Sequence, residues 1–426
     1  MKTISRIISV FIFLSLQLNA QETWTCYTDD DALLMDDHIV KGMFDYKDGS
    51  LWIVTNKGIN IFKDGSWKII NKKSDLLKNK IGSYMIDSKD RIWIGTGSPD
   101  IFFDGYALGH LYEGGVVIYD GDEWKPLQTE DLGIKAPVIT RMYEASNGDV
   151  WMGMSAVSPG AERGALFPKG ALLRLAAETE EWTIYKGKDM PCIDCHFIKG
   201  FYEDENNRVH FFADFGIFYF EDDAFHSIRK DHEEFNFSRG NYISARFTDS
   251  NNNLWLGAPA RIARHDGKNW RSFNRKNGLP SMDNPPYGFA ETSNGKIIMT
   301  AVNGVYTYDN EDQWVKEKMK LLTGNSYIDG QGRHWIPSLK GLIIRDGENE
   351  TLHKNIPKVW RVLKDTNDGI WAITRNKGIH RYMDGQWQAF NKDNQLPSDR
   401  VTMFFTSSNG AVWIGTNKGI CSCEYD

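Results

Sequence analysis

The sequence has few of the features that mark several large classes of protein. Its 426 residues include only five cysteines, and no apolar run after the first twenty residues is long enough to span a membrane. Basic residues are outnumbered by acidic ones, 50 to 57, and the net charge of −7 argues against a nucleic-acid partner, because phosphate binding needs clustered positive charge. The hydrophobic content of 41% is still ample for a folded core.

The N-terminus has the pattern of an export signal. Lys2 and Arg6 precede the apolar stretch IISVFIFLSL, and LNA before Gln21 is a small-residue cleavage site. We therefore predict a signal peptide at 1–20, a single domain at 21–426, and a periplasmic or secreted protein. An oxidising compartment permits disulfides, and the odd cysteine count leaves at least one thiol outside them.

The 15 tryptophans recur within an internal repeat. Stretches such as LWIVTNKGINIFKDGSW, LWLGAPARIARHDGKNW and IWAITRNKGIHRYMDGQW align, and they define nine units separated by 36 to 59 residues. The aligned aromatic column is Trp52, Trp93, Trp151, His210, Trp255, Ile298, Trp335, Trp371 and Trp413. We expect nearly every tryptophan to pack in the core.

Each unit indicates four short strands joined by glycine turns. Asp48-Gly49 and Asn147-Gly148 follow the first strand, and Asp64-Gly65 and Asp384-Gly385 precede the fourth; such pairs favour type I′ hairpins, in which both central residues have positive φ. No helical period appears over a useful length. The sequence thus predicts an all-β fold, a single β-propeller of four-stranded antiparallel blades. Nine blades is the count; eight blades and one irregular hairpin is the alternative, with the His210 unit as the doubtful one.

The ends of the chain predict how the ring closes. The ninth unit stops after its third strand, at GICSCEYD, and the segment ETWTCY after the signal supplies a fourth strand. Transferring the register of the eighth unit places Cys423 opposite Trp24 and Cys421 opposite Cys26. This pair is a non-hydrogen-bonded one, in which side chains lie closest, so we predict a Cys26–Cys421 disulfide; two buried thiols are the alternative.

The repeat resembles a known family. Units of the form D-x-x-G-x-[LIV]-W-I-G-T-x-x-G-[LI]-x-x-[YF]-D-G-x-x-W, best matched at Ser407–Asp426, Asp365–Ser398, Asp249–Ser281 and Asp87–Trp124, are similar to the two-component regulator propeller repeat. The resemblance implies the exported sensor part of a hybrid histidine kinase, and some members recognise oligosaccharides. The sequence lacks the kinase part and the membrane span, so we expect signalling only through a partner. The family usually builds seven-bladed rings, which this repeat count exceeds.

Insertions indicate where a ligand binds. Unit two inserts residues 97–113, unit three inserts 155–169, and the connection between units three and four holds MPCIDCHF. All three open from one face of the ring, and loops on a rigid scaffold are where binding residues concentrate. The candidate ligand-binding residues are Phe102, Phe103, Tyr106, His110, Tyr112, Arg163 and Phe167. Packing of these loops on one another is the alternative.

Two arginines stand out on the innermost strands. The positions ten residues before the aromatic column are Gly42, Ser83, Arg141, Gly200, Ala245, Gly288, Asn325, Arg361 and Met403. Small residues dominate there, as expected where strands crowd the axis. Arg141 and Arg361 depart from this rule and are candidate contacts for an anion or carboxylate. The alternative is a structural pair with a nearby acid.

Cofactor motifs are scarce. Cys192, Cys195 and His196 have the C-x-x-C-H spacing of haem c attachment, but no helical haem domain surrounds them, and we prefer a Cys192–Cys195 disulfide. The DSNNN stretch at 249–253 has calcium-loop oxygens but lacks the sixth-position glycine and the distal glutamate. We therefore expect no metal or other cofactor, with haem c and calcium as minor alternatives. No hydrolase, zinc-protease, phosphate-loop or dinucleotide motif is present.

These observations favour binding over catalysis. We predict an exported, non-catalytic, monomeric sensor-type propeller that binds a glycan, a peptide or a protein partner, such as a membrane sensor, at the rim of units two and three. A carbohydrate- or peptide-active enzyme on the same face is one alternative, since propellers also host enzymes. A c-type haem protein is the other.

Overall fold

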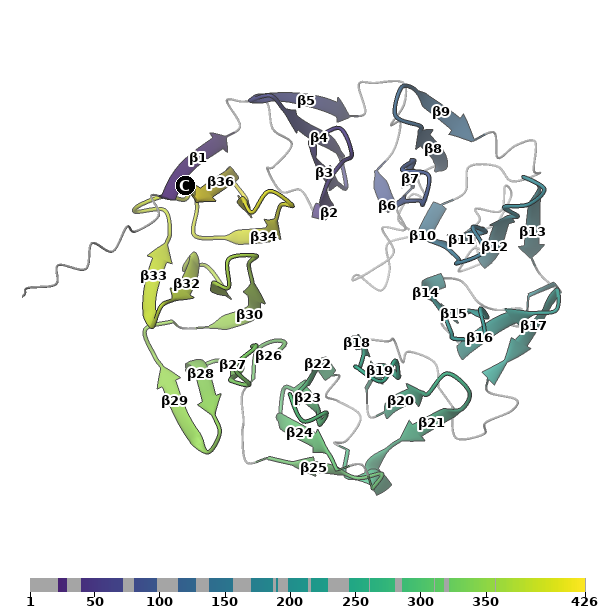
Figure 1. Ribbon diagram of the computed structural model, residues 1–426. Helices are drawn as coiled ribbons and strands as arrows, with labels where there is room; N and C mark the ends of the chain where they lie inside the picture. Colours follow the sequence, from purple (N-terminus) through teal and green to yellow (C-terminus); the bar gives the residue numbers. More distant parts are fainter. Residues whose placement is uncertain are drawn as a thin grey trace, which may run out of the picture.

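Nine antiparallel sheets of four strands stand around a common axis in the computed structural model of the protein (Figure 1). The structure describes residues 22–28, 40–71, 80–97, 114–127, 138–155, 170–186, 189–190, 198–213, 216–228, 245–259, 261–279, 286–309, 311–317, 322–356 and 358–425. Within these ranges the fold is a nine-bladed β-propeller, which confirms the predicted class and count. The unit that contains His210 is a complete blade.

The first three blades follow the predicted order, and each runs from the axis outward. Blade one is β2 (Val40–Asp45), β3 (Leu51–Thr55), β4 (Gly58–Lys63) and β5 (Ser66–Asn71). Blade two is β6 (Ile81–Ile86), β7 (Ile92–Thr96), β8 (Gly115–Tyr119) and β9 (Trp124–Leu127). Blade three is β10 (Val138–Glu144), β11 (Val150–Ser155), β12 (Gly170–Leu175) and β13 (Trp182–Lys186).

The middle three blades have the same layout. Blade four is β14 (Ile198–Glu203), β15 (Val209–Ala213), β16 (Gly216–Glu221) and β17 (Ala224–Ser227). Blade five is β18 (Ala245–Thr248), β19 (Leu254–Ala258), β20 (Arg261–His265) and β21 (Trp270–Phe273), followed by a 3-10 helix at Arg275–Asn277. Blade six is β22 (Pro286–Glu291), β23 (Ile297–Ala301), β24 (Gly304–Tyr308) and β25 (Trp314–Lys316).

The last three blades complete the ring. Blade seven is β26 (Tyr327–Ile328), β27 (His334–Ser338), β28 (Gly341–Asp346) and β29 (Asn349–His353). Blade eight is β30 (Val359–Lys364), β31 (Ile370–Thr374), β32 (Ile379–Met383) and β33 (Gln386–Phe390). Blade nine is β34 (Val401–Thr406), β35 (Val412–Thr416), β36 (Gly419–Tyr425) and β1 (Glu22–Thr28).

Strand β1 closes the ring from the other end of the chain. It pairs antiparallel with β36, Trp24 lies opposite Cys423, and Cys26 lies opposite Cys421. The Cα atoms of Cys26 and Cys421 are 4.0 Å apart, and their sulfurs form a disulfide. Both the predicted closure and the predicted disulfide are confirmed. The register transfers because the eighth blade has the same pairing, with Tyr382 opposite Trp387.

The turns differ from the prediction at one of their two positions. Between the third and fourth strands, both residues of Asp64-Gly65 and of Asp384-Gly385 have positive φ, as a type I′ turn requires. Between the first and second strands, only the glycines Gly49 and Gly148 do. There the amide of Gly49 donates to the carbonyl of Tyr46, and the amide of Tyr46 donates to Ser50. The loop between first and second strands is therefore longer than a two-residue hairpin loop and needs only one left-handed residue. The type I′ prediction is wrong at these turns.

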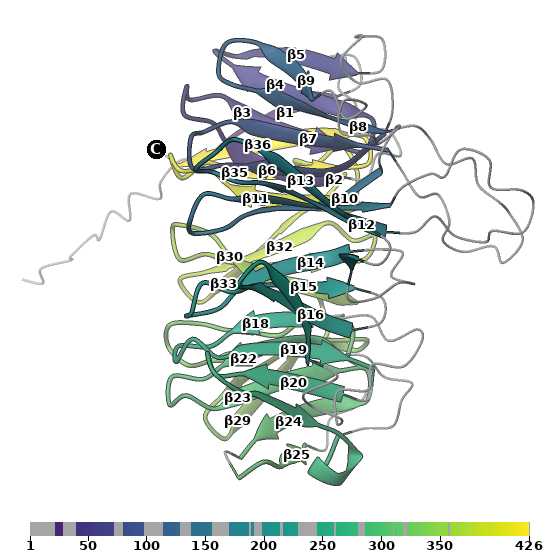
Figure 2. The same ribbon diagram turned by 90° about the vertical axis from the view of Figure 1, so that its right-hand side faces the viewer.

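Two faces of the ring follow from this topology, and Figure 2 shows the strands running between them. The face that carries the turns between first and second strands is here called the turn face. The opposite face, where second strands pass to third strands and blades are joined, is called the connection face. None of the helices in the described part of the chain has the length and hydrophobicity that a membrane span requires.

The aromatic column fills the wedges between blades. Trp93, Trp151, Trp255, Trp335 and Trp371 are at most 1% exposed. In four blades the indole nitrogen also donates to an aspartate at the start of the preceding turn, over 2.7–2.8 Å, in the pairs Trp93–Asp87, Trp255–Asp249, Trp335–Asp329 and Trp371–Asp365. A buried N–H without a partner destabilises a core, so each aspartate removes that penalty.

Candidate functional site

The predicted rim falls on segments outside the described residues. Phe102, Phe103, Tyr106, His110, Tyr112, Arg163, Phe167, Cys192, Cys195 and His196 all lie in those segments, and their roles stay predictions. The strand ends that flank them are described. Thr96 and Ser155 end β7 and β11, and each pairs with the first residue of the innermost strand of its blade. These flanking ends therefore lie at the connection face.

Arg141 and Arg361 lie near the same face. Arg141 is the fourth residue of β10 and Arg361 is the third residue of β30, and both side chains are exposed. Partial burial nevertheless lowers the pKa of Arg141. One of its nitrogens donates to the backbone carbonyl of Thr140 over 2.6 Å. The other positions of the column are crowded, as predicted: a Cβ on Gly288 would lie 2.7 Å from the side chain of Asn325.

Two further cations lie on innermost strands, and one of them, Lys41, is near Arg141. Lys41 is the second residue of β2 and is exposed; burial lowers its pKa, and the charge of Arg141 lowers it further. Arg246 on β18 donates to the carbonyl of Phe201 over 3.0 Å and lies over the ring of Tyr202. Burial also lowers the pKa of Arg246. Lys41, Arg141 and Arg361 are here called the axial cations.

The opposite ends of the innermost strands carry carboxylates. Glu144 accepts from the amide and the hydroxyl of Ser88, over 2.6 and 2.7 Å. Glu203 and Glu291 accept in the same way from Ser146 and Ser250. Each of these contacts joins one blade to the next at the turn face. The carboxylates thus have a structural role, and they lie away from the axial cations.

This separation gives the ring a polarity along its axis. Lys41 and Arg361 lie toward the connection-face ends of their strands and Arg141 lies mid-strand, whereas Glu144, Glu203 and Glu291 end their strands at the turn face, as Lys364 does in β30. Lys41 and Arg141 belong to different blades, so their proximity places like charges together, which is unfavourable without a counter-charge. The electrostatic arrangement suits an anionic group at the connection face.

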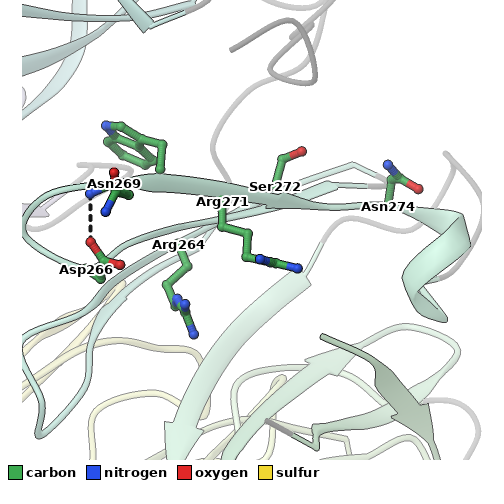
Figure 3. A pocket seen from close by; sticks show the side chains of 7 residues that line it. Arg264, Asp266, Asn269, Arg271, Ser272 and Asn274 are labelled. Carbon is green, nitrogen blue, oxygen red and sulfur yellow. Dashed lines mark hydrogen bonds between the residues drawn. The ribbon is translucent and has the colours of Figure 1, made fainter. Parts of the chain in front are cut away.

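A cavity of about 500 Å³ lies elsewhere, on the outer strands of blade five (Figure 3). Arg264 and Arg271 lie opposite each other on β20 and β21, and their side chains point to the same side of the sheet. Arg264 approaches the hydroxyl of Tyr308 at 3.4 Å, and Arg271 pairs with Asp312. Both partners belong to blade six. These arginines therefore join two blades, and the cavity is a polar groove at the outside of the ring.

Metal-ligating side chains gather in one place among the described residues. Asp204, His210 and His265 are buried, and their ligand atoms all lie within 4.8 Å of one another. This group is between blades four and five and is separate from the axial cations. The sequence analysis did not predict this group.

The sequence prediction found part of this arrangement. Arg141 and Arg361 depart from a column of small residues, which is a signal visible in the sequence, whereas Lys41 and Arg246 lie one position to either side of that column. His265 stands in the third-strand column, where other blades have Tyr119, Phe220, Tyr308 and Tyr382, and this departure is the signal for it.

The fold and the repeat together define the class, a β-propeller. A family model described as "Two component regulator propeller" matches residues 395–418, so the chain carries a repeat of this family, as the resemblance predicted. No curated protein matches the chain.

Solved structures with a similar ring are distant in sequence. One is the extracellular domain of the putative one component system BT4673 from B. thetaiotaomicron, at 14% identity and a TM-score of 0.44, over 93% of this chain and 58% of that one. Another is the extracellular domain of the putative hybrid two component system BT3049 from the same organism, at 17% identity and a TM-score of 0.40, over 90% and 56%. A streptogramin B lyase aligns at 14% identity and a TM-score of 0.40, over 95% and 98%. The chain thus spans little more than half the length of the first two.

Proposed function

We propose that this protein is an exported, non-catalytic recognition module of the sensor type, which binds an anionic ligand at the connection face. The observation that carries the proposal is the proximity of Lys41 and Arg141, on innermost strands that begin at the face from which the insertions of blades two and three open. Lys41 and Arg141 are close enough for one charge to lower the pKa of the other. A bound carboxylate or sulfate would relieve that repulsion.

The ligand class that fits is an acidic oligosaccharide or an acidic peptide. The axial cations would hold its negative group, and the aromatic residues predicted for the insertions, such as Phe102, Tyr106 and Phe167, would cover its apolar surface. Rigid blades joined by the serine–carboxylate contacts would keep the cations in place, which limits the entropy lost on binding. Binding without catalysis requires only that the cations and aromatic residues are held in position around the ligand.

The test is a screen of neutral and acidic glycans and acidic peptides, followed by calorimetry on the hits. The triple variant Lys41→Gln/Arg141→Gln/Arg361→Gln should weaken binding by about 100-fold, since each charge contributes roughly 1 kcal/mol. The same variant should lose most of the salt dependence of binding. Product analysis on the bound ligand should show no turnover.

A matched control removes charge from the outside of the ring. Lys68→Gln/Lys316→Gln changes exposed lysines on β5 and β25 and should leave the affinity unchanged. Equal weakening by both variants would mean that only net charge matters. Selection of neutral ligands whose binding ignores the triple variant would contradict the proposal.

A further inference from the structure

The interface between blades four and five has an unusual side-chain pair. At other interfaces a tryptophan of the aromatic column packs against a tyrosine or phenylalanine of the next blade, with ring centroids 5.0–5.4 Å apart. These pairs are Trp52–Tyr119, Trp151–Phe220, Trp255–Tyr308 and Trp335–Tyr382. Between blades four and five both positions are histidine, His210 and His265, at 5.3 Å. Two large apolar rings are thus replaced together by two imidazoles.

His210 keeps only part of the role of tryptophan. Its Nε2 lies 2.9 Å from Oδ2 of Asp204, the equivalent of the indole-to-aspartate bond in four other blades. An imidazole has a second nitrogen, and Nδ1 of His210 has no hydrogen-bond partner among the described residues. Substitution by histidine therefore leaves a buried polar atom that tryptophan would not leave.

His265 adds further buried polar atoms that lack hydrogen-bond partners among the described residues. Its ring is fully buried, at 0% exposure, and neither Nδ1 nor Nε2 has a hydrogen-bond partner among the described residues. The indole of Trp270 packs beside it at 4.6 Å and shields it from solvent. Buried polar atoms without partners are rare in folded proteins and indicate an ion or a water between them.

The three side chains form a suitable set of ligands. Two imidazole nitrogens and one carboxylate oxygen are donors that zinc accepts, at about 2.0–2.2 Å each. The donors lie within 4.8 Å of one another, and donors of a tetrahedral zinc are about 3.4 Å apart, so the farthest pair needs to close in by at most about 1.4 Å. A neutral imidazole is the form that binds metal.

The surroundings provide a second shell and a suitable charge. Asp204 Oδ1 accepts from the amides of Asn206 and Arg208, and Arg208 Nε lies 2.7 Å from Oδ2. Glu221 lies 4.0 Å from Arg208. The charges of Asp204, Arg208 and Glu221 sum to −1, which favours a cation. Arg208 is partly exposed and marks the side from which an ion can enter.

We propose that Asp204, His210 and His265 form a site for a divalent transition metal, zinc in the first instance, that joins blades four and five. On binding, the neutral imidazole of His210 changes tautomer, so that its proton moves from Nε2 to Nδ1 and Nε2 takes the metal, while Arg208 stays on Asp204 as an orienting partner. Three protein ligands leave a fourth position for water. The site would stabilise the ring, independently of any ligand at the connection face.

The test measures metal in the full chain without a histidine tag. The protein is stripped with chelator, equilibrated with ZnCl₂, and its zinc content is determined by mass spectrometry. We expect one zinc per chain at this site, a higher melting temperature with zinc than with chelator, and a visible ligand-field spectrum when CoCl₂ replaces zinc.

The decisive variant is His210→Trp/His265→Tyr, which restores the pair found at the neighbouring interfaces and should therefore fold. It should lose one zinc equivalent, with affinity at the site reduced by about 100-fold or more, and it should lose the cobalt spectrum. His334→Leu is the matched control, because His334 is also buried and both its ring nitrogens lack partners among the described residues. It should keep the metal.

Two outcomes would overturn the proposal. The wild type could hold no more zinc than His210→Trp/His265→Tyr, in which case any metal belongs elsewhere, such as Cys192 and Cys195. The double variant could instead fold normally and melt higher than the wild type under every metal condition, which would assign the two histidines to water alone.

Discussion

Removal of the Cys26–Cys421 disulfide tests how the ring is held closed. The bond joins residues 395 apart in the sequence, almost the whole described chain. In the chain-entropy model, a loop of this length stabilises the folded state by about 6 kcal/mol, because the reduced unfolded chain gains that much freedom. Domains are typically stable by only about 5–15 kcal/mol, so the expected loss is a large share.

Other contacts of β1 decide whether the reduced ring still folds. All seven residues of β1 pair with β36, and the ring of Trp24 lies 4.6 Å from Phe390. Tyr27 packs on Phe62 of blade one at 5.2 Å. These contacts do not depend on the sulfurs, so we expect Cys26→Ser/Cys421→Ser to fold and to lose about 3–6 kcal/mol.

The assay is urea unfolding followed by tryptophan fluorescence, with and without reductant. The double serine variant should have a lower midpoint and a larger m-value than the oxidised wild type, because its unfolded chain is more expanded. Reduced wild type should coincide with the variant, and Cys423→Ser should retain the shift on reduction. A double variant within about 0.5 kcal/mol of the oxidised wild type would refute the reasoning, as would an unchanged m-value.

Two further predictions concern stability. Glu144→Gln removes a charged acceptor that joins blades two and three, and it should lower the free energy of unfolding by about 1 kcal/mol in urea titrations. Glu348 is exposed, so Glu348→Gln should leave the free energy of unfolding unchanged. Equal losses in the two variants would contradict the role of Glu144 in joining the blades. Burial lowers the pKa of His334 from 6.5 to about 3, with a smaller effect of Arg345. The unfolded chain therefore binds a proton on this histidine below pH 6.5, whereas the folded chain does not bind it until about pH 3. The free energy of unfolding thus decreases as pH falls, by about 2 kcal/mol at pH 5. His334→Leu should lose this part of the pH dependence in melts from pH 7 to pH 4, and an unchanged slope would contradict it.

Most of the fold could be predicted because its signals are local. Hairpin turns such as Asp384-Gly385 fix the register of neighbouring strands, and that register could be carried from blade eight to the pair Cys26 and Cys421. The type I′ prediction was wrong at Asp48-Gly49 because an Asp-Gly pair occurs both between first and second strands and between third and fourth strands. The length of the loop, and not its composition, decides which residue has positive φ.

Contacts between blades could not be predicted in the same way. The bond from Ser88 to Glu144 joins residues on different sheets, and no local pattern sets the distance between them. Proximity of Lys41 to Arg141 depends on the curvature of the ring. The sequence shows His210 as a departure from the tryptophan column. That His265 lies beside it is known only from the structure, in which blades four and five face each other.

The closure by β1 has a consequence for biosynthesis. Translation produces β1 first and its partner β36 last, so during almost the whole of synthesis β1 is a strand without a neighbour, which is a hazard for aggregation. Cys26 is likewise the first of five cysteines to appear, and Cys192 and Cys195 precede its native partner. Pairing in the order of synthesis would join Cys26 to Cys192, so the native bond requires either that Cys26 stays reduced until Cys421 is available or that a wrong pair is isomerised.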